Sequence, residues 1–117
     1  MTYLNLSTGL ALTVALLNVA LGAVSANAQI ITDILSTGET AIYDEEPLGA
    51  GESFIITCDS DCDDIDARLY DAYSDELIDS DTADDAVPIV TTDYSGHFRL
   101  EVDMISCDAL FCSIFVE

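Results

Sequence analysis

Positively charged residues are scarce in this sequence. Its 117 residues include no lysine, two arginines, one histidine and 23 acidic residues, so that the formal net charge is −21. Such a surface repels nucleic acid phosphates and anionic membranes, and it attracts cations. We therefore expect divalent cations as partners, no nucleic acid, and no membrane once the chain is processed. A high-salt habitat is an alternative cause of the acidity, since salt screens repulsion among carboxylates.

Residues 1–28 contain no charged side chain at all. Residues 10–24 are mostly apolar, and Ser25-Ala26-Asn27-Ala28 ends in an A-x-A pattern, which together predict a secretory signal peptide cut after Ala28. A transmembrane anchor is the alternative, but the apolar run is short for a span and polar residues interrupt it. We expect a secreted or periplasmic protein whose single domain covers residues 29–117.

Catalytic motifs are also missing. The single histidine, His97, lies beside a turn on the polar side of an alternating segment, where a solvated side chain is more common than a general base. Neither G-x-S-x-G nor H-E-x-x-H is present, and no Cys–His nucleophile arrangement is recognisable. We therefore expect a protein that is not an enzyme.

No helical period is convincing after residue 28, whereas several segments alternate between apolar and polar residues. The clearest is His97 to Ile105, in which Phe98, Leu100, Val102 and Met104 share one side. Short strands separated by turns predict an all-β, antiparallel β-sandwich. The expected strands are 30–35, 40–43, 53–58, 64–70, 76–79, 87–92, 97–105 and 111–116, with a loop marked by Pro47, Gly49 and Gly51.

All four cysteines follow residue 28. An even number in a small exported domain predicts disulfides, and of the three possible pairings Cys58–Cys62 and Cys107–Cys112 are the simplest, each across a predicted hairpin. A zinc site is the rival interpretation, but the usual C-x2-C spacing is absent.

Aspartates crowd the predicted connections 59–63, 80–86 and 106–110. If successive strands run in opposite directions, all three connections fall at one end of the sandwich. Calcium, which prefers six to eight oxygen ligands, is the candidate cofactor, although an EF-hand is excluded because its Gly and Glu positions hold other residues. Hydrated turn residues are the alternative interpretation. The candidate ligands are Asp59, Asp61, Asp63, Asp64, Asp84, Asp85 and Asp108.

Several motifs together resemble the bacterial pre-peptidase C-terminal domain: CDSDCDDIDARLYDA, then YSGHFRLEV, then CDALFCSIFVE, within residues 53–117. The resemblance implies a jelly-roll-like β-sandwich that is often appended to secreted peptidases, with calcium or an extracellular polymer bound by some members. The turn at 73–75 lacks the glycine common in that family, and no peptidase is attached.

We interpret the chain as a secreted, non-catalytic binding or accessory module of this type. One alternative is a structural envelope protein whose acidity maintains solubility in salt. Another is a partner or inhibitor of a secreted enzyme.

Overall fold

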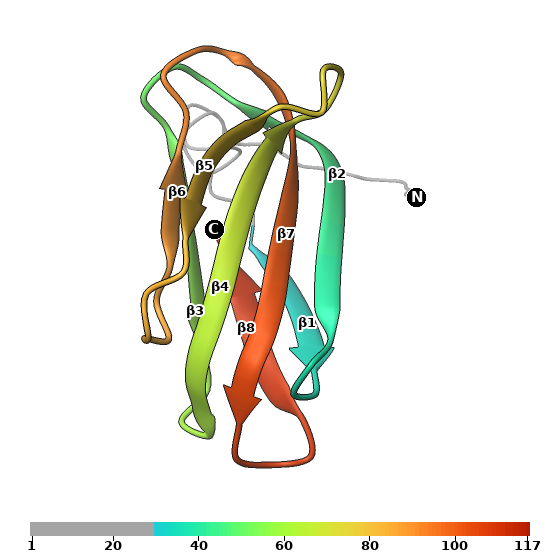
Figure 1. Cartoon of the computed structure of the whole chain (residues 1–117), viewed down its shortest axis with the longest axis vertical. Helices are drawn as coiled ribbons and strands as arrows, with labels where there is room; N and C mark the ends of the chain where they lie inside the picture. The colour runs from blue at the N-terminus through green and yellow to red at the C-terminus, as the bar shows by residue number, and fades with distance from the viewer. Residues whose placement is uncertain (1–29) are drawn as a thin grey trace, which may run out of the picture.

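The computed structural model describes residues 30–117, which form two four-stranded antiparallel sheets packed against each other (Figure 1). The predicted all-β sandwich is therefore confirmed. In the described part of the chain there is no helix of the length and apolarity that crossing a membrane requires. The predicted signal peptide, residues 1–28, lies outside the described residues.

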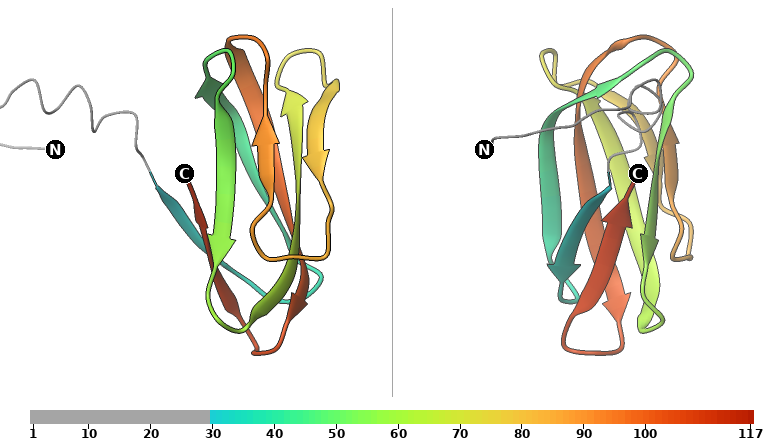
Figure 2. Two further views of the ribbon diagram at one scale, coloured as in Figure 1. Left: turned by 90° about the vertical axis from the view of Figure 1, so that its left-hand side faces the viewer. Right: turned by 180° about the vertical axis from the view of Figure 1, so that it is seen from behind.

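The first sheet, called sheet 1 here, has the strand order β1-β8-β3-β6. Its strands are β1 (Ile31–Leu35), β8 (Cys112–Val116), β3 (Ser53–Cys58) and β6 (Ile89–Thr91). Sheet 2 has the order β2-β7-β4-β5, with β2 (Thr40–Leu48), β7 (Gly96–Cys107), β4 (Cys62–Asp71) and β5 (Leu77–Asp81). Figure 2 shows the two layers from the side and from behind.

Consecutive strands alternate between the two sheets, with the single exception of β4 and β5, which are hydrogen-bonded neighbours in sheet 2. Eight strands in this order make a jelly roll, as the resemblance implied. One part of the prediction is wrong: the cysteine-bearing connections are not hairpins. β3 and β4 belong to different sheets, and so do β7 and β8. Alternation of apolar and polar residues within a strand shows which side of the strand is buried, but not which strand lies next to it. The sequence therefore did not reveal that the chain passes from one sheet to the other at these two connections.

The core lies between the sheets and follows the predicted alternation. Phe98, Leu100, Val102 and Met104 of β7 are fully buried, as are Ile65, Ala67 and Leu69 of β4. Antiparallel register aligns these side chains in layers, with Leu69 opposite Leu100 and Ala67 opposite Val102. Sheet 1 closes the core from the other side through a further set of buried residues: Phe54, Ile56, Val90, Ile114 and Val116.

Only β3 has the predicted boundaries; most of the others differ by one or two residues, and β2 differs most. β2 continues past Tyr43 to Leu48, with a register shift between Tyr43 and Glu46, and Glu45 has a φ of 54° at this irregularity. Pro47 therefore belongs to a strand and not to a loop, which a proline tolerates because β2 is an edge strand. β6 is shorter than predicted and covers only Ile89–Thr91.

The sheets are also joined along one side by carboxylates. Asp79 and Asp81 of β5 accept hydrogen bonds from the backbone N–H groups of Thr91 (2.8 Å) and Ile89 (3.0 Å) of β6. Neither edge strand has a further strand beside it, so these carboxylates stand in for the backbone carbonyls of a missing neighbour. The sandwich is thereby closed at the β5–β6 side.

Candidate functional site: the acidic end

The connections β3–β4, β5–β6 and β7–β8 approach the same end of the sandwich, the lower end in Figure 1. Backbone hydrogen bonds tie them together. The Asp108 N–H donates to the Asp61 carbonyl (2.8 Å), and the Ile65 N–H donates to the Asp85 carbonyl (3.0 Å). We call this region, residues 59–64, 82–88 and 106–111, the acidic end. Strands that alternate in direction predict this arrangement, which the structure contains.

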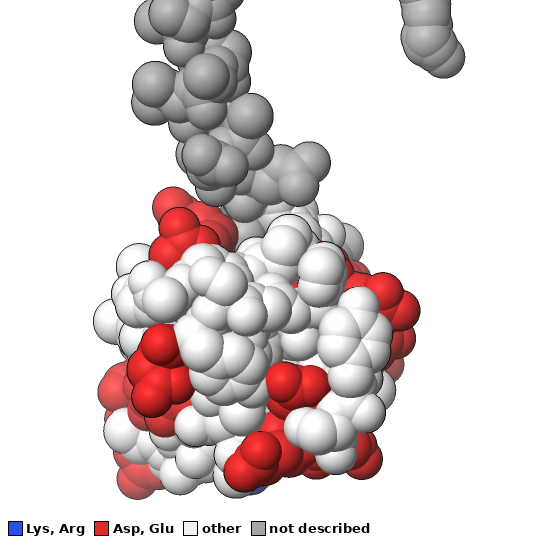
Figure 3. All heavy atoms as spheres, turned by 90° about the horizontal axis from the view of Figure 1, so that it is seen from above, with Lys and Arg blue, Asp and Glu red and all other residues white. Residues whose placement is uncertain are grey.

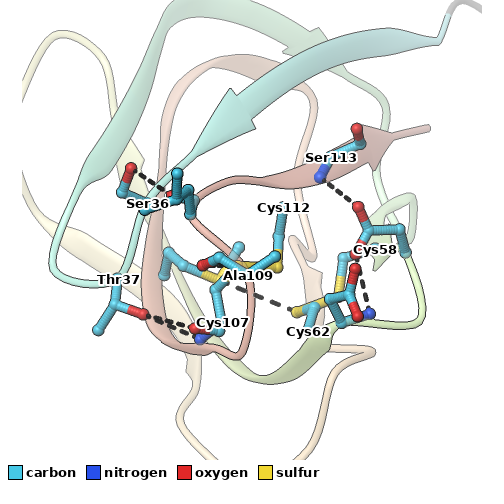
Figure 4. Close-up of a disulfide and its surroundings, with 12 residues drawn as sticks. Ser36, Thr37, Cys58, Cys62, Cys107, Ala109, Cys112 and Ser113 are labelled. Atoms are coloured by element: carbon cyan, nitrogen blue, oxygen red, sulfur yellow. Dashed lines mark hydrogen bonds between the residues drawn. A yellow bond between two sulfur atoms is a disulfide. The ribbon is translucent and has the colours of Figure 1, made fainter.

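Two disulfides fix the acidic end (Figure 4). Cys58 is bonded to Cys62 and Cys107 to Cys112, the pairings that the spacing favoured. Each bond joins a strand of sheet 1 to a strand of sheet 2, so both clamp the two layers together. Disulfides form and persist in oxidising compartments, so the two bonds indicate an oxidising, extracellular-type environment.

The loop between Cys107 and Cys112 is held from both sides. Thr37 exchanges two hydrogen bonds with the backbone of Cys107, and the Ser36 hydroxyl donates to the Leu110 carbonyl (2.9 Å). On the other side lies the bond from Asp108 to Asp61. The backbone at the acidic end is thus ordered before any ligand arrives, which lowers the entropy lost on binding.

The expected ligands divide into three groups. Asp59 acts as a turn residue, since its carboxylate accepts the N–H groups of Asp61 (3.1 Å) and Ser113 (2.8 Å). Asp63 and Asp108 face each other, and the hydrogen bond that they share raises the pKa of Asp108, with a further contribution from the Asp63 charge. Asp61 belongs to the same group as Asp59, to which its N–H donates; it is exposed and accepts the Asp108 N–H through its carbonyl oxygen.

The third group surrounds Asp64 at the start of β4. Burial raises the pKa of the Asp64 carboxyl, and the charges of Asp84 and Asp85 on the β5–β6 connection raise it further, while a hydrogen bond with the Asp85 backbone lowers it. Its Oδ1 is buried and has no hydrogen-bond partner, although the side chain as a whole is partly exposed. A buried carboxylate oxygen without a donor is costly, so Asp64 is the member of the group whose hydrogen bonding is incomplete.

Asp66 belongs beside Asp64 but was not among the expected ligands. Burial is the largest cause of its raised pKa and the Asp64 charge is the next, whereas the Arg68 charge lowers the pKa. Residues two apart on a strand point to the same face, so the alternation of β4 could have revealed this neighbour.

The carboxylates around Asp64 do not form a complete set of metal ligands in this structure. Within residues 30–117 no three His, Cys, Asp or Glu side chains are positioned to hold a metal ion. Asp84 and Asp85 are exposed residues of a connection, whereas Asp64 is fixed at the start of a strand. A cation at Asp64 would therefore draw the two connection carboxylates toward it.

A cavity of about 460 Å³ lies away from the acidic end, between the end of β2, the start of β3 and the end of β8. Leu48, Phe54 and Val116 line it, together with the carboxylates of Glu46 and Glu52. None of the expected ligands lines this cavity.

No family model and no curated protein matches the chain. The resemblance to the pre-peptidase C-terminal domain therefore stays a prediction from the motifs.

Proposed function

We propose that this protein is an exported, non-catalytic binding module of the pre-peptidase C-terminal type that takes up calcium at its acidic end. The observation that carries the proposal is the buried Oδ1 of Asp64, which has no hydrogen-bond partner, next to the charges of Asp84 and Asp85 that help to raise the pKa of this carboxyl group. A hard divalent cation would satisfy that oxygen and relieve the repulsion in one step. The two disulfides support export, because they persist in oxidising compartments.

Thermal unfolding of the disulfide-bonded protein tests calcium binding. With the affinity typical of extracellular calcium modules, about 10 mM calcium would stabilise the fold by roughly 1.4–2.7 kcal/mol. The melting temperature is compared in calcium, in magnesium and in chelator at matched ionic strength. Equal melting temperatures in all three would refute the proposal.

Asp64→Asn is the decisive variant. It removes the charge that the fold leaves without a partner, so stability in chelator should rise or stay equal, while the increment from calcium should disappear. Asp44→Asn, on the exposed surface of β2, removes the same charge elsewhere and should keep the increment. A calcium increment that survives Asp64→Asn would assign the binding to other carboxylates.

A second function has one observation in its favour. Seen from the end opposite the disulfides, Asp and Glu side chains are spread over several sides of the molecule (Figure 3). This spread supports an envelope or matrix protein whose acidity maintains solubility in salt. In that case sodium chloride at equal ionic strength would stabilise the fold as well as calcium does.

A further inference from the structure

Two cysteines that are not bonded to each other, Cys62 of β4 and Cys107 of β7, are paired in antiparallel register. The ladder bond beside this pair runs from the Asp108 N–H to the Asp61 carbonyl (2.8 Å), one residue outside the pair on each strand. The Cys62 N–H donates elsewhere, to the Asp59 carbonyl (3.2 Å). The two cysteines therefore occupy a non-hydrogen-bonded position, where the Cα atoms of an antiparallel pair are closest, at about 4.5 Å.

Both side chains lie on the inner side of sheet 2. Cys62 is 7% exposed, and its Sγ lies 3.9 Å from the Sδ of the buried Met104 on β7. Cys107 packs against the same core. Figure 4 shows the two cysteines with their present partners. A disulfide tolerates Cα separations of about 4.4–6.8 Å, so the position of Cys62 opposite Cys107 falls within the span of one bond.

The other two cysteines are not placed for a bond with each other. Cys58 of β3 is in register with Ile114 of β8, and Cys112 lies two residues before Ile114. Such diagonal positions are about 7–8 Å apart, which exceeds the separation that a disulfide bridges without backbone movement. A Cys62–Cys107 bond would therefore leave Cys58 and Cys112 as thiols.

Exposure decides which sulfur a reductant reaches. Cys58 is partly exposed, whereas its partner Cys62 is buried. In thiol–disulfide exchange the attacked sulfur keeps the incoming thiol and the other sulfur leaves as a thiolate. Attack at Cys58 therefore releases Cys62, which is the cysteine that faces Cys107.

We propose that the acidic end contains a thiol–disulfide switch, in which a small thiol converts the two bonds between the layers into one Cys62–Cys107 bond within sheet 2. The external thiolate attacks Cys58, the Cys58–Cys62 bond breaks, and a mixed disulfide forms. The Cys62 thiolate then attacks Cys107, and Cys112 leaves and is protonated. A second thiol cleaves the mixed disulfide. Two thiols are thereby oxidised to one disulfide, and two protein thiols, Cys58 and Cys112, are formed.

The exchange changes what holds the two layers together. Both present bonds join sheet 1 to sheet 2, whereas the new bond joins two neighbouring strands of sheet 2. The acidic end can then open between the layers, while Asp63 and Asp108, which follow the two newly bonded cysteines, stay together on sheet 2. The switch goes beyond the proposed calcium binding and does not depend on it.

Trypsin makes the new bond directly visible. The chain has two cleavage sites, Arg68 and Arg99, and no lysine. One cysteine pair lies before Arg68 and the other after Arg99, so the present disulfides leave the two fragments separate and a Cys62–Cys107 bond links them. The folded, disulfide-bonded protein is treated with an equimolar amount of dithiothreitol, its thiols are blocked at low pH, and the tryptic fragments are analysed by mass spectrometry without further reduction.

We expect linked fragments as a main product from the folded protein. In a denatured chain the Cys62–Cys107 bond closes a loop of 45 positions, against 4 and 5 for the present bonds. Loop closure then favours the local bonds, so the same treatment in concentrated guanidinium chloride should give about tenfold less of the linked product. Equal yields from folded and denatured protein overturn the proposal, and so does an absence of linked fragments from the folded protein.

A matched pair of variants tests the geometry alone. Cys58→Ala with Cys112→Ala leaves Cys62 and Cys107, which should form a bond under mild oxidation of the folded protein. Cys62→Ala with Cys107→Ala leaves Cys58 and Cys112, which should remain thiols. Alkylation and intact mass count the free thiols. Formation of the second bond as readily as the first contradicts the proposal, and partial reduction of the parent protein decides it even if neither variant folds.

Discussion

Cys62 of β4 lies directly opposite Cys107 of β7 in antiparallel register, yet the two are not bonded to each other. Cys62 is bonded to Cys58 and Cys107 to Cys112, and both of these partners lie on sheet 1. Each disulfide is therefore local in sequence but joins the two layers in space. The four cysteines close one end of the sandwich, and the same end carries the candidate cation ligands.

Removal of one disulfide should lower stability without loss of the fold. Cys107→Ser with Cys112→Ser opens a short loop, and the chain-entropy estimate is about 2 kcal/mol, or a fall of about 10 °C in melting temperature. Calorimetry of the variant beside the parent measures it. An unchanged melting temperature would mean that hydrogen bonds from Ser36, Thr37 and Asp61 hold the loop without the bond.

Asp81→Ala should loosen the junction between β5 and β6. The variant leaves the Ile89 N–H without its acceptor, which costs about 1–2 kcal/mol. Amide hydrogen exchange at Ile89 should accelerate, while exchange at the core residue Leu100 changes only as much as global stability falls. Asp93→Ala, in an exposed connection, serves as the control and should leave exchange at Ile89 unchanged.

Acid should weaken the turn between β4 and β5. The Tyr94 hydroxyl donates to Asp71 (2.6 Å), and this bond, with the N–H groups of Ser74 and Tyr73, lowers the pKa of Asp71 to about 2. Because the folded pKa lies below the unfolded value of about 3.9, this stabilisation is present above pH 4 and is lost as pH falls toward 2. Carboxyl NMR titration measures the pKa directly.

Tyr94→Phe provides the test of that cause. The variant removes the largest contribution, so the pKa of Asp71 should rise toward its ordinary value. The same hydrogen bond raises the pKa of Tyr94 to about 12, so its stabilisation is lost only as pH rises from about 10 toward 12. An Asp71 pKa that stays near 2 in the variant would assign the shift to the backbone donors alone.

Leu100→Ala should be among the most damaging single changes. Leu100 is fully buried opposite Leu69, and truncation of a core leucine costs about 2–5 kcal/mol. Urea denaturation measures it, since guanidinium would also screen the carboxylates. Ile105→Ala is the control on the same strand, where the side chain is exposed and the cost should stay below about 1 kcal/mol.

The sequence by itself determined the buried side of each long strand. Alternation in β4 and β7 identified Ile65, Leu69, Phe98 and Met104 as core residues, because a strand with one buried face must repeat every two residues. Cysteine spacing favoured the two pairings that the structure contains. Crowded aspartates indicated an acidic end, since Asp is typical of turns.

Only the tertiary structure decided which strands are neighbours. Pairing of β4 with β7 joins residues from 27 (Asp71 and Phe98) to 45 (Cys62 and Cys107) positions apart, and no local pattern encodes such contacts. The sequence predicted that the Cys58–Cys62 disulfide closes a hairpin. Because β3 and β4 belong to different sheets, this disulfide instead joins the two layers. The tertiary structure also brought Asp84 and Asp85 close to Asp64, and it placed the strands without charged residues, β3, β6 and β8, in one sheet. The physical reason is that many strand arrangements satisfy the same alternation, and long-range packing selects among them.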